Sequence, residues 1–311
     1  MKFPKLKNKA VLSPMAGITD IAFRHLARKY GAALTYTEFV HSKAILHKNK
    51  RTLQMLQTSP LEKPSAVQLF GNSLTDILEA AKILKKFDII DVNCGCPAYK
   101  VIKTGAGSAL LNNPDKIYKF ISTLTSKINK PITLKIRTGI NSKNINAVEI
   151  AKKAEKAGAS LITIHGRTQK QGYSGKANWD IIKEVKESVN IPVIGNGDIF
   201  SPEDFKEKLE YSGVDYIMIA RGAISNTYIF TQIKDYLKKG NYKEKNKLEQ
   251  FQEYLKLAIK YEISFQQIKT HAISFTKGLE KGAIQRNKLS KCKNLEELKS
   301  ASSFSFNNVI I

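Results

Sequence analysis

The sequence predicts an α/β protein: a (β/α)8 TIM barrel followed by a small C-terminal domain that contains only helices. The first observation is that eight short, strand-like apolar runs alternate with helix-like segments over about 230 residues. The second is that this alternation stops near Gly240, after which only helix-like segments follow. A doubly wound parallel sheet is the alternative fold, but such a sheet seldom needs eight evenly spaced units.

The eight predicted strands are short and apolar, and they comprise residues 10–13, 33–39, 65–70, 87–93, 132–136, 161–165, 191–195 and 214–220. The segments between them, such as SLTDILEAAKILKKF and NAVEIAKKAEKAGAS, carry apolar residues at helical spacing. The segment SPEDFKEKLEYSG begins with Ser201 as a helix cap, followed by Pro202 and two acids, and it ends at Gly213. These signals predict helices between successive strands.

The polar stretch KKGNYKEKNK around Gly240 separates two regions of different character. Beyond it, LEQFQEYLKLAIKYE and ISFQQIKTHAISFTKGLEKG have the apolar spacing of helices. We therefore predict a barrel domain over residues 1–240 and a helical domain over residues 245–311.

The protein is strongly basic. Its 311 residues include 51 Lys and Arg against 27 Asp and Glu, a formal net charge of +24. The excess is spread over both regions, with +6 in residues 240–311 and +18 in the remainder. Such a charge favours a polyanionic partner, of which nucleic acid is the commonest. A lysine-rich surface that is merely solvated is the alternative.

Three cysteines are too few for a disulfide framework, which fits a reducing cytoplasm. The basic N-terminus lacks the apolar stretch of a signal peptide, so none is predicted. A run of about 20 apolar residues is also lacking, so no membrane contact is predicted. We infer no obligate protein partner.

The carboxyl ends of the predicted strands carry polar or glycine-rich groups: SPMAG, TEF, VQLFGN, DVNCGCP, LKIRTG, IHGRT, IGNGD and IARGA. In a barrel of this kind these ends meet at one mouth, where active sites form. The polar residues expected to surround the mouth are Gln68, Asn93, Lys135, Arg137, His165, Arg167, Asn196, Asp198 and Arg221. A barrel without a site would not need polar residues at so many strand ends, so we predict an active site there.

The last two strand ends, GNGD and ARGA, are suited to a phosphate group. Glycines allow backbone N–H groups to approach an anion, and Arg221 adds a positive charge. Taken alone, GNGD could equally be a tight turn. Lys135 and His165 would suit a reduced flavin, which carries negative charge on its ring system. The alternative for Lys135 is a lysine that extends from a strand end into solvent.

Together these motifs resemble the tRNA-dihydrouridine synthases, which are FMN-containing barrels with a helical RNA-binding domain. The matching stretches are SPMAGITD, VQLFG, NCGCPAYKV, GAGSALL, LKIRTG, IHGRT, IPVIGNGDI and IARGA, and they cover roughly residues 10–225. The sequence is most similar to the bacterial B-type branch of this family. In the C-terminal region the match is weaker, because Thr270 precedes His271 where that branch has a lysine.

The resemblance implies roles for individual residues. It implies that FMN is bound by Pro14, Met15, Ala16, Gln68, Lys135, His165, Asn196, Gly197, Asp198, Ala220 and Arg221. It implies that the target uridine and its nucleotide are met by Asn93, Lys100 and Arg137. The resemblance also implies NADPH as the reductant, with NADH as the alternative, since no nicotinamide fingerprint is visible in the sequence.

The two cysteines of DVNCGCP are interpreted differently. A metal site needs three or four ligands, and only the distant Cys292 could join them, so no metal is predicted. A disulfide across one residue would be strained. In the family pattern, Cys94 occupies a variable position and Cys96 the working one. A thiol with a pKa of about 8.5 is mostly protonated at neutral pH, so we expect Cys96 to donate the proton that saturates the uracil 5,6 double bond.

The predicted function is therefore NADPH-dependent reduction of specific tRNA uridines to dihydrouridine. One alternative is an FMN-dependent barrel acting on a free pyrimidine, similar to a dihydroorotate dehydrogenase. The charge of +24 and the helical region argue against it, because a small substrate requires neither. The other is a non-catalytic tRNA-binding protein, against which the intact Cys96, Lys135 and His165 argue.

Overall fold

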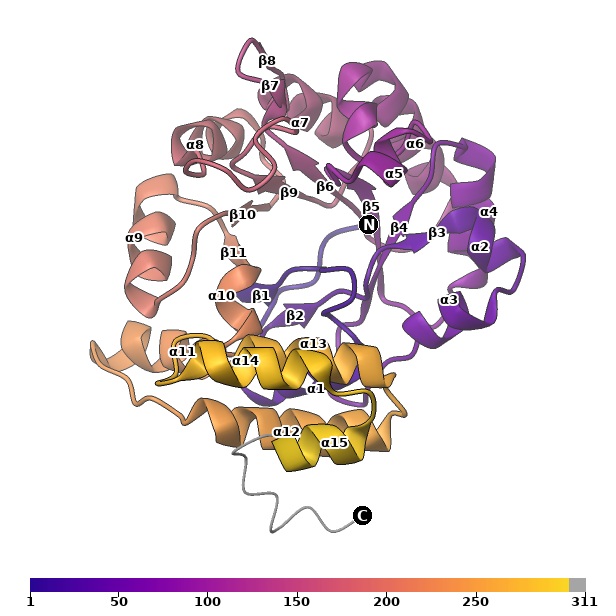
Figure 1. The fold of residues 1–311 in the computed structure, drawn as a ribbon. Coiled ribbons are helices and arrows are strands. Elements are labelled where there is room, and N and C mark those ends of the chain that lie inside the picture. Colours follow the sequence, from indigo (N-terminus) through magenta and orange to yellow (C-terminus); the bar gives the residue numbers. More distant parts are fainter. Residues whose placement is uncertain (302–311) are drawn as a thin grey trace.

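The computed structural model describes residues 1–301, and nine of its strands form one parallel sheet (Figure 1). Their order in the sheet is β2-β1-β11-β10-β9-β6-β5-β4-β3. In chain order they are β1 (Ala10–Leu12), β2 (Leu34–Thr35), β3 (Val40–His41), β4 (Ala66–Phe70), β5 (Ile89–Cys94), β6 (Ile132–Arg137), β9 (Leu161–His165), β10 (Val193–Asn196) and β11 (Tyr216–Ile219). Each of the eight predicted strands has a counterpart in this sheet, the second in a shortened form, and the predicted TIM-barrel fold is confirmed.

The second predicted strand, residues 33–39, is interrupted in the structure. Of this range only Leu34–Thr35 form a strand, β2, whereas β3 begins after it at Val40; the two strands lie at opposite ends of the strand order. Between them, Tyr36 forms a parallel bridge to Ala66, so the sheet closes on itself. The chain leaves the ladder at Glu38, whose carboxylate accepts a hydrogen bond from the Gly17 backbone N–H at 2.6 Å.

Helices surround the sheet between successive strands (Figure 1). They are α1 (Ile21–Lys29), α2 (Ser42–Leu46), α3 (Lys50–Met55), α4 (Leu74–Ile83), α5 (Tyr99–Ile102), the 3-10 helix η1 (Gly107–Asn112), α6 (Pro114–Lys127), α7 (Ala147–Lys156), α8 (Trp179–Ser188), α9 (Pro202–Ser212), α10 (Arg221–Ile224) and α11 (Ile229–Lys239). A hairpin, β7 (Gly139–Asn141) and β8 (Asn144–Ile145), follows β6. Helix α9 begins as predicted, with a capping box between Ser201 and Asp204.

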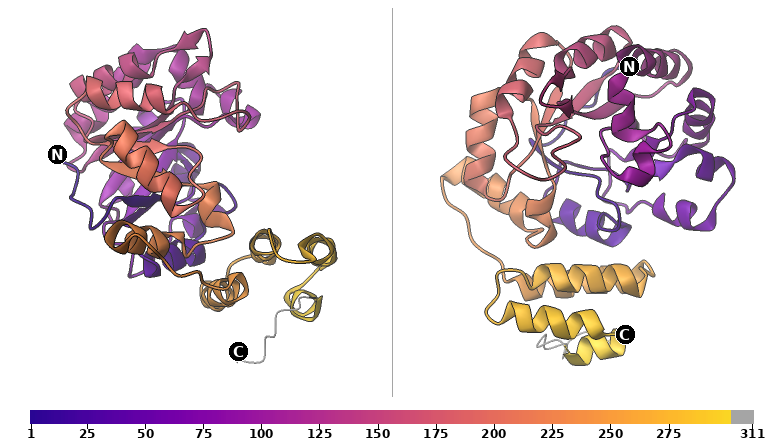
Figure 2. Two further views of the ribbon diagram at one scale, coloured as in Figure 1. Left: turned by 90° about the vertical axis from the view of Figure 1, so that its left-hand side faces the viewer. Right: turned by 45° about the horizontal axis from the view of Figure 1, so that its top comes forward.

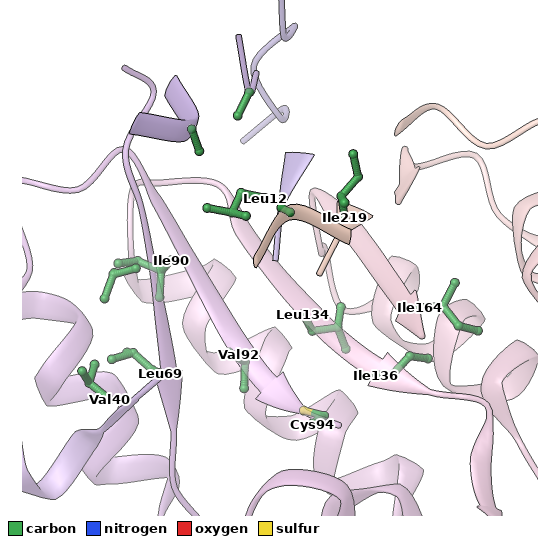
Figure 3. Close-up of a cluster of buried hydrophobic side chains, with 14 of the residues drawn as sticks. Leu12, Val40, Leu69, Ile90, Val92, Cys94, Leu134, Ile136, Ile164 and Ile219 are labelled. Atoms are coloured by element: carbon green, nitrogen blue, oxygen red, sulfur yellow. The ribbon is translucent and has the colours of Figure 1, made fainter. Parts of the chain in front are cut away.

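Alternation along the strands divides apolar from polar side chains. On β5, Ile90, Val92 and Cys94 belong to the apolar core between the strands and the helices, as Figure 3 shows. Asp91 and Asn93 lie between them in sequence and therefore face the interior of the barrel, since successive side chains point to opposite faces. The two cysteines thus already differ in their surroundings, because Cys94 is part of the core.

Four helices follow the barrel: α12 (Lys247–Lys260), α13 (Phe265–Phe275), α14 (Gly282–Lys291) and α15 (Leu295–Ala301). Figure 2 shows them beside the ring of the barrel. None of the helices in residues 1–301 combines the length and the apolarity that crossing a membrane would require. The proposed division at about residue 240 remains a prediction, and residues 302–311 of the predicted helical domain lie outside the described part.

The C-terminal helices are attached to the barrel through a buried polar cluster. The Tyr254 hydroxyl donates to the Asp20 carboxylate at 3.0 Å. His271 is fully buried; its Nε2 lies 3.0 Å from the carbonyl oxygen of Ile18, and its ring stacks on Phe23. His271 therefore joins α13 to the segment after β1, and its position inside this contact is not suited to touching RNA.

Candidate active site

A cavity of about 440 Å³ opens at the carboxyl ends of the strands. It is lined by all but two of the residues predicted for the site or its mouth, namely Pro14, Met15, Ala16, Gln68, Asn93, Cys96, Lys135, Arg137, His165, Asn196, Gly197, Asp198, Ala220 and Arg221. The exceptions are Lys100, which is exposed on α5, and Arg167, which is buried behind the lining and bonded to Asp198. The barrel fold thus brings together residues that are up to about 200 positions apart in the sequence.

Strand register accounts for the proximity of the polar side chains. Asn93 on β5 is paired with Lys135 on β6, and Arg137 with His165 on β9. His165 is in turn paired with Asn196 on β10. Because paired residues of parallel strands lie side by side, these groups form a continuous polar lining.

Two glycines let backbone approach closely after β10 and β11. Gly197 has a φ of +147°, and a Cβ added there would lie 2.4 Å from the Cβ of Ala177. A Cβ on Gly222 would lie 2.2 Å from the carbonyl oxygen of Ile199. Substitution at either position would force these loops apart. Both loops therefore require glycine for their packing, and their use for a phosphate group remains a prediction.

Asp198 links two arginines at this end of the cavity. Its carboxylate accepts from Arg167 and from Arg221, each at 2.8 Å. The Arg221 guanidinium also lies 5.1 Å from the ring centre of Tyr173 and 5.5 Å from that of Phe200. Tyr173 and Phe200 line the cavity but were not predicted, because they belong to loops and follow no strand-end pattern.

Lys135 and His165 have strongly altered acidities. Burial, with a further effect of Arg137, lowers the pKa of Lys135 to about 7. Its Nζ donates to the Asn196 side-chain oxygen at 3.0 Å. Burial, together with Lys135 and the nearby arginines, also lowers the pKa of His165 well below its ordinary value. At neutral pH His165 is therefore a neutral hydrogen-bonding group.

Asn93 and Arg137 hold the loop that carries Cys96. The Asn93 side-chain oxygen accepts from the backbone N–H groups of Gly95 at 3.2 Å and Cys96 at 2.9 Å. Arg137 donates through Nε to the carbonyl oxygen of Gly95 at 3.0 Å. Both residues were predicted as substrate contacts. They line the cavity, and they also fix the backbone of this loop.

The two cysteines of this loop differ in position and acidity. Cys94 is only 1% exposed and packs in the apolar core (Figure 3). Cys96 is half-buried and lines the cavity. Burial raises the pKa of the Cys96 thiol, against the opposing effects of the Ala98 N–H, Arg137 and Lys135. At neutral pH the thiol of Cys96 is therefore protonated and faces the cavity.

Within residues 1–301, no group of three or more His, Cys, Asp or Glu side chains is arranged to hold a metal ion.

Residues 11–310 match the family model described as dihydrouridine synthase (Dus). The chain belongs to the dihydrouridine synthase family. Enzymes of this family are flavin-dependent oxidoreductases that act on uridines in tRNA, so the protein is an enzyme of this class. The resemblance expected from the sequence motifs is confirmed.

Curated relatives agree with this assignment. The chain is 42% identical over 239 residues to tRNA-dihydrouridine synthase B of Shewanella oneidensis, covering 76% of this chain and 74% of the relative. It is 43% identical over 219 residues to a probable tRNA-dihydrouridine synthase of Rhizobium leguminosarum bv. phaseoli, covering 70% and 69%. The relatives named as B-type enzymes support the predicted similarity of this dihydrouridine synthase to the B-type branch.

Solved structures support the fold alone. Histamine dehydrogenase from Rhizobium sp. 4-9 superposes with a TM-score of 0.57 at 14% identity, covering 81% of this chain and 49% of that one. A 2-naphthoyl-CoA reductase superposes with a TM-score of 0.58 at 11% identity, covering 75% and 50%.

Proposed function

We propose that this dihydrouridine synthase reduces the 5,6 double bond of tRNA uridines with FMN as its flavin and NADPH as its reductant, and that Cys96 donates the proton. The observation that carries the proposal is the strand-end cavity, in which a protonated thiol, the amides of Gln68 and Asn93, and the half-buried Lys135 meet. Neither a free-pyrimidine enzyme nor a non-catalytic binding protein accounts for both this cavity and the family match.

FMN suits the two ends of this cavity. At one end, the close backbone approach at Gly197 and Gly222 and the positive charge of Arg221 suit a phosphate group. At the other end, Gln68 and Lys135 carry hydrogen-bond donors for the polar edge of the flavin ring. The further residues proposed to contact FMN are Pro14, Met15, Ala16, His165, Asn196, Asp198 and Ala220.

Reduction of the uracil double bond requires a hydride at one carbon and a proton at the other. Bound reduced flavin supplies the hydride for one carbon of the uracil double bond. Cys96 supplies the proton for the other carbon, since its raised pKa keeps the thiol protonated. The thiolate that remains is stabilised by the Ala98 N–H and by the charges of Arg137 and Lys135. Asn93 and Arg137 orient the Cys96 loop and contact the uracil.

The proposal for the reductant rests on the family resemblance. NADPH is the proposed donor of electrons, and NADH is the alternative. The proposed location is the cytoplasm, where both nucleotides and tRNA are present, and no obligate protein partner is required for the reaction.

The tRNA must deliver a uridine that is normally stacked within its fold. Flipping a base into a cavity costs a few kcal/mol. Contacts of basic residues with phosphates offset this cost. Lys100 and Lys103 are exposed just beyond Cys96, and we propose that they contact the backbone next to the target nucleotide. The helical domain, residues 245–311, supplies further contacts.

The flavin assignment is tested on the purified protein. We expect non-covalent FMN, released by denaturation with an absorption maximum at about 450 nm, the ordinary value for an oxidised flavin. Gly222→Ala should lose it, because the added Cβ would meet the carbonyl oxygen of Ile199. Chromatography and mass spectrometry identify the released flavin. FAD in stoichiometric amount, or no flavin after reconstitution, would contradict the proposal.

A further inference from the structure

Asp91 is a buried carboxylate for which the proposed chemistry has no direct use. It lies on β5 two residues before Asn93, faces the barrel interior and is 1% exposed. Its Oδ2 accepts a hydrogen bond from Gln68 Nε2 at 2.7 Å, and its Oδ1 accepts one from the Thr133 hydroxyl. Burying a carboxylate is costly unless hydrogen bonds compensate for it, so this group requires an explanation.

A chain of hydrogen bonds runs from Asp91 to the Cys96 loop. Gln68 donates to Asp91 and accepts through Oε1 from Asn93 Nδ2 at 2.8 Å. Asn93 in turn accepts through Oδ1 from the backbone N–H groups of Gly95 and Cys96. Every member of the chain except the two backbone groups is a buried side chain.

The direction of this chain is set at the carboxylate. Both oxygens of Asp91 accept hydrogen bonds, one from Gln68 and one from Thr133, which is the arrangement of an ionised carboxylate. Burial raises the pKa of Asp91 to about 6, and Thr133 and Gln68 oppose the rise. An ionised carboxylate can only accept hydrogen bonds, whereas an amide can be turned to present either its oxygen or its nitrogen. Asp91 therefore orients Gln68, and Gln68 orients Asn93. The oxygen of Asn93 consequently faces the loop, where two N–H donors need an acceptor.

We propose that Asp91 is a positioning residue, which acts through Gln68 and Asn93 to hold the Cys96 loop in its reactive arrangement. Its consequence for catalysis rests on the proposed function of Cys96. The positioning itself is a property of the protein alone and is measurable without tRNA or a reductant.

Asp91→Asn removes the fixed direction while keeping the shape of the side chain. An amide at this position has no fixed direction, because it can present either its oxygen or its nitrogen to Gln68. When its nitrogen donates to Gln68 Oε1, Gln68 turns and Asn93 turns with it. The Asn93 nitrogen would then face the N–H groups of Gly95 and Cys96, where donor meets donor. We expect the loop to open more often and Cys96 to react faster with iodoacetamide, by about threefold to tenfold, the range for loss of one or two hydrogen bonds.

A second substitution should restore the series of hydrogen bonds, with each donor and acceptor along it exchanged. In the double variant Asp91→Asn/Asn93→Asp, the amide introduced by the first substitution can donate to Gln68. Gln68 can then donate to the carboxylate introduced by the second, and that carboxylate accepts from both loop N–H groups. Asn93→Asp alone places two carboxylates beside a single amide. We therefore expect each single variant to label Cys96 faster than the original protein does. The double variant should return to within about twofold of the original labelling rate, as a coupled pair requires.

The experiment measures iodoacetamide labelling of the purified full-length chain at neutral pH, with each cysteine followed by peptide mass spectrometry. Cys94 and Cys292 are buried and serve as internal references for general unfolding. Thr133→Val is the matched control, because it removes a donor to Asp91 but leaves the direction from Gln68 to Asn93 unchanged. It should label Cys96 at the original rate.

Equal labelling rates of Cys96 in the original protein and in Asp91→Asn would overturn the proposal. A double variant that labels Cys96 as fast as the faster of the two single variants would also overturn it. If Asp91→Asn does not fold, the double variant decides the question. A double variant that folds and labels Cys96 at the original rate supports the hydrogen-bond chain. If neither Asp91→Asn nor the double variant folds, Asp91 acts only as a core group. Since no measurement involves tRNA, these outcomes are independent of whether Cys96 is the proton donor.

Discussion

Cys96→Ala should lose tRNA reduction by about 10²–10⁴-fold, the usual cost of removing a positioned general acid. The thiol lines the cavity and is protonated at neutral pH, because burial raises its pKa. Flavin binding and flavin reduction by NADPH should persist, since neither the glycine-rich loops nor Lys135 depends on the thiol. The loss should be measured in a single turnover, by mixing the pre-reduced enzyme with tRNA.

Cys94→Ala is the matched control for this experiment. Cys94 precedes Cys96 by two residues, but its side chain packs in the core and does not line the cavity. We expect tRNA reduction close to that of the original protein. Equal impairment of the two variants, or a slower reaction in Cys94→Ala, would show that a single proton donor is the wrong mechanism.

Binding of tRNA should weaken steeply as salt is added. A protein that neutralises 6–10 phosphates loses roughly 10³–10⁵ in affinity between 50 and 200 mM salt, because bound counterions are released on binding. The net charge of +24 and its spread over both regions favour many such contacts. Binding should be measured by filter retention or fluorescence across this range. A slope near zero on logarithmic axes would mean that the charge only solvates the surface.

Two lysines near the cavity allow this effect to be localised. Lys100 and Lys103 are exposed after β5, on the side of the barrel where the cavity opens. Changing each to glutamine should lower the salt slope by about one for every phosphate that is no longer neutralised. Lys127 is the control: it is exposed in the last turn of α6, which ends at the opposite side, just before β6 begins. Its replacement by glutamine should leave the slope unchanged.

Much of the candidate site was predictable because a parallel barrel follows a simple rule. Polar residues at the ends of successive strands must meet at one mouth, so Gln68, Lys135 and His165 could be assigned to one cavity from their sequence positions. Lys100 could not be excluded from the lining in this way. It follows a strand end by several residues, and the position of its side chain depends on how α5 is oriented. Tyr173 and Phe200 lie on loops and were missed for a similar reason.

The sequence by itself determined the alternation of strands and helices, the strand-end residues, the family and the distinction between Cys94 and Cys96. These properties depend on short-range pattern, that is, on side-chain period, helix caps and motif spacing. The tertiary structure alone decided the break in the second strand, the burial of His271 and the hydrogen-bond chain from Asp91 to the Cys96 loop. Each of these involves contacts between groups far apart in the chain, such as Tyr36 with Ala66 or His271 with Ile18. Such contacts form only when the barrel closes and the C-terminal helices pack against it, so no local pattern specifies them.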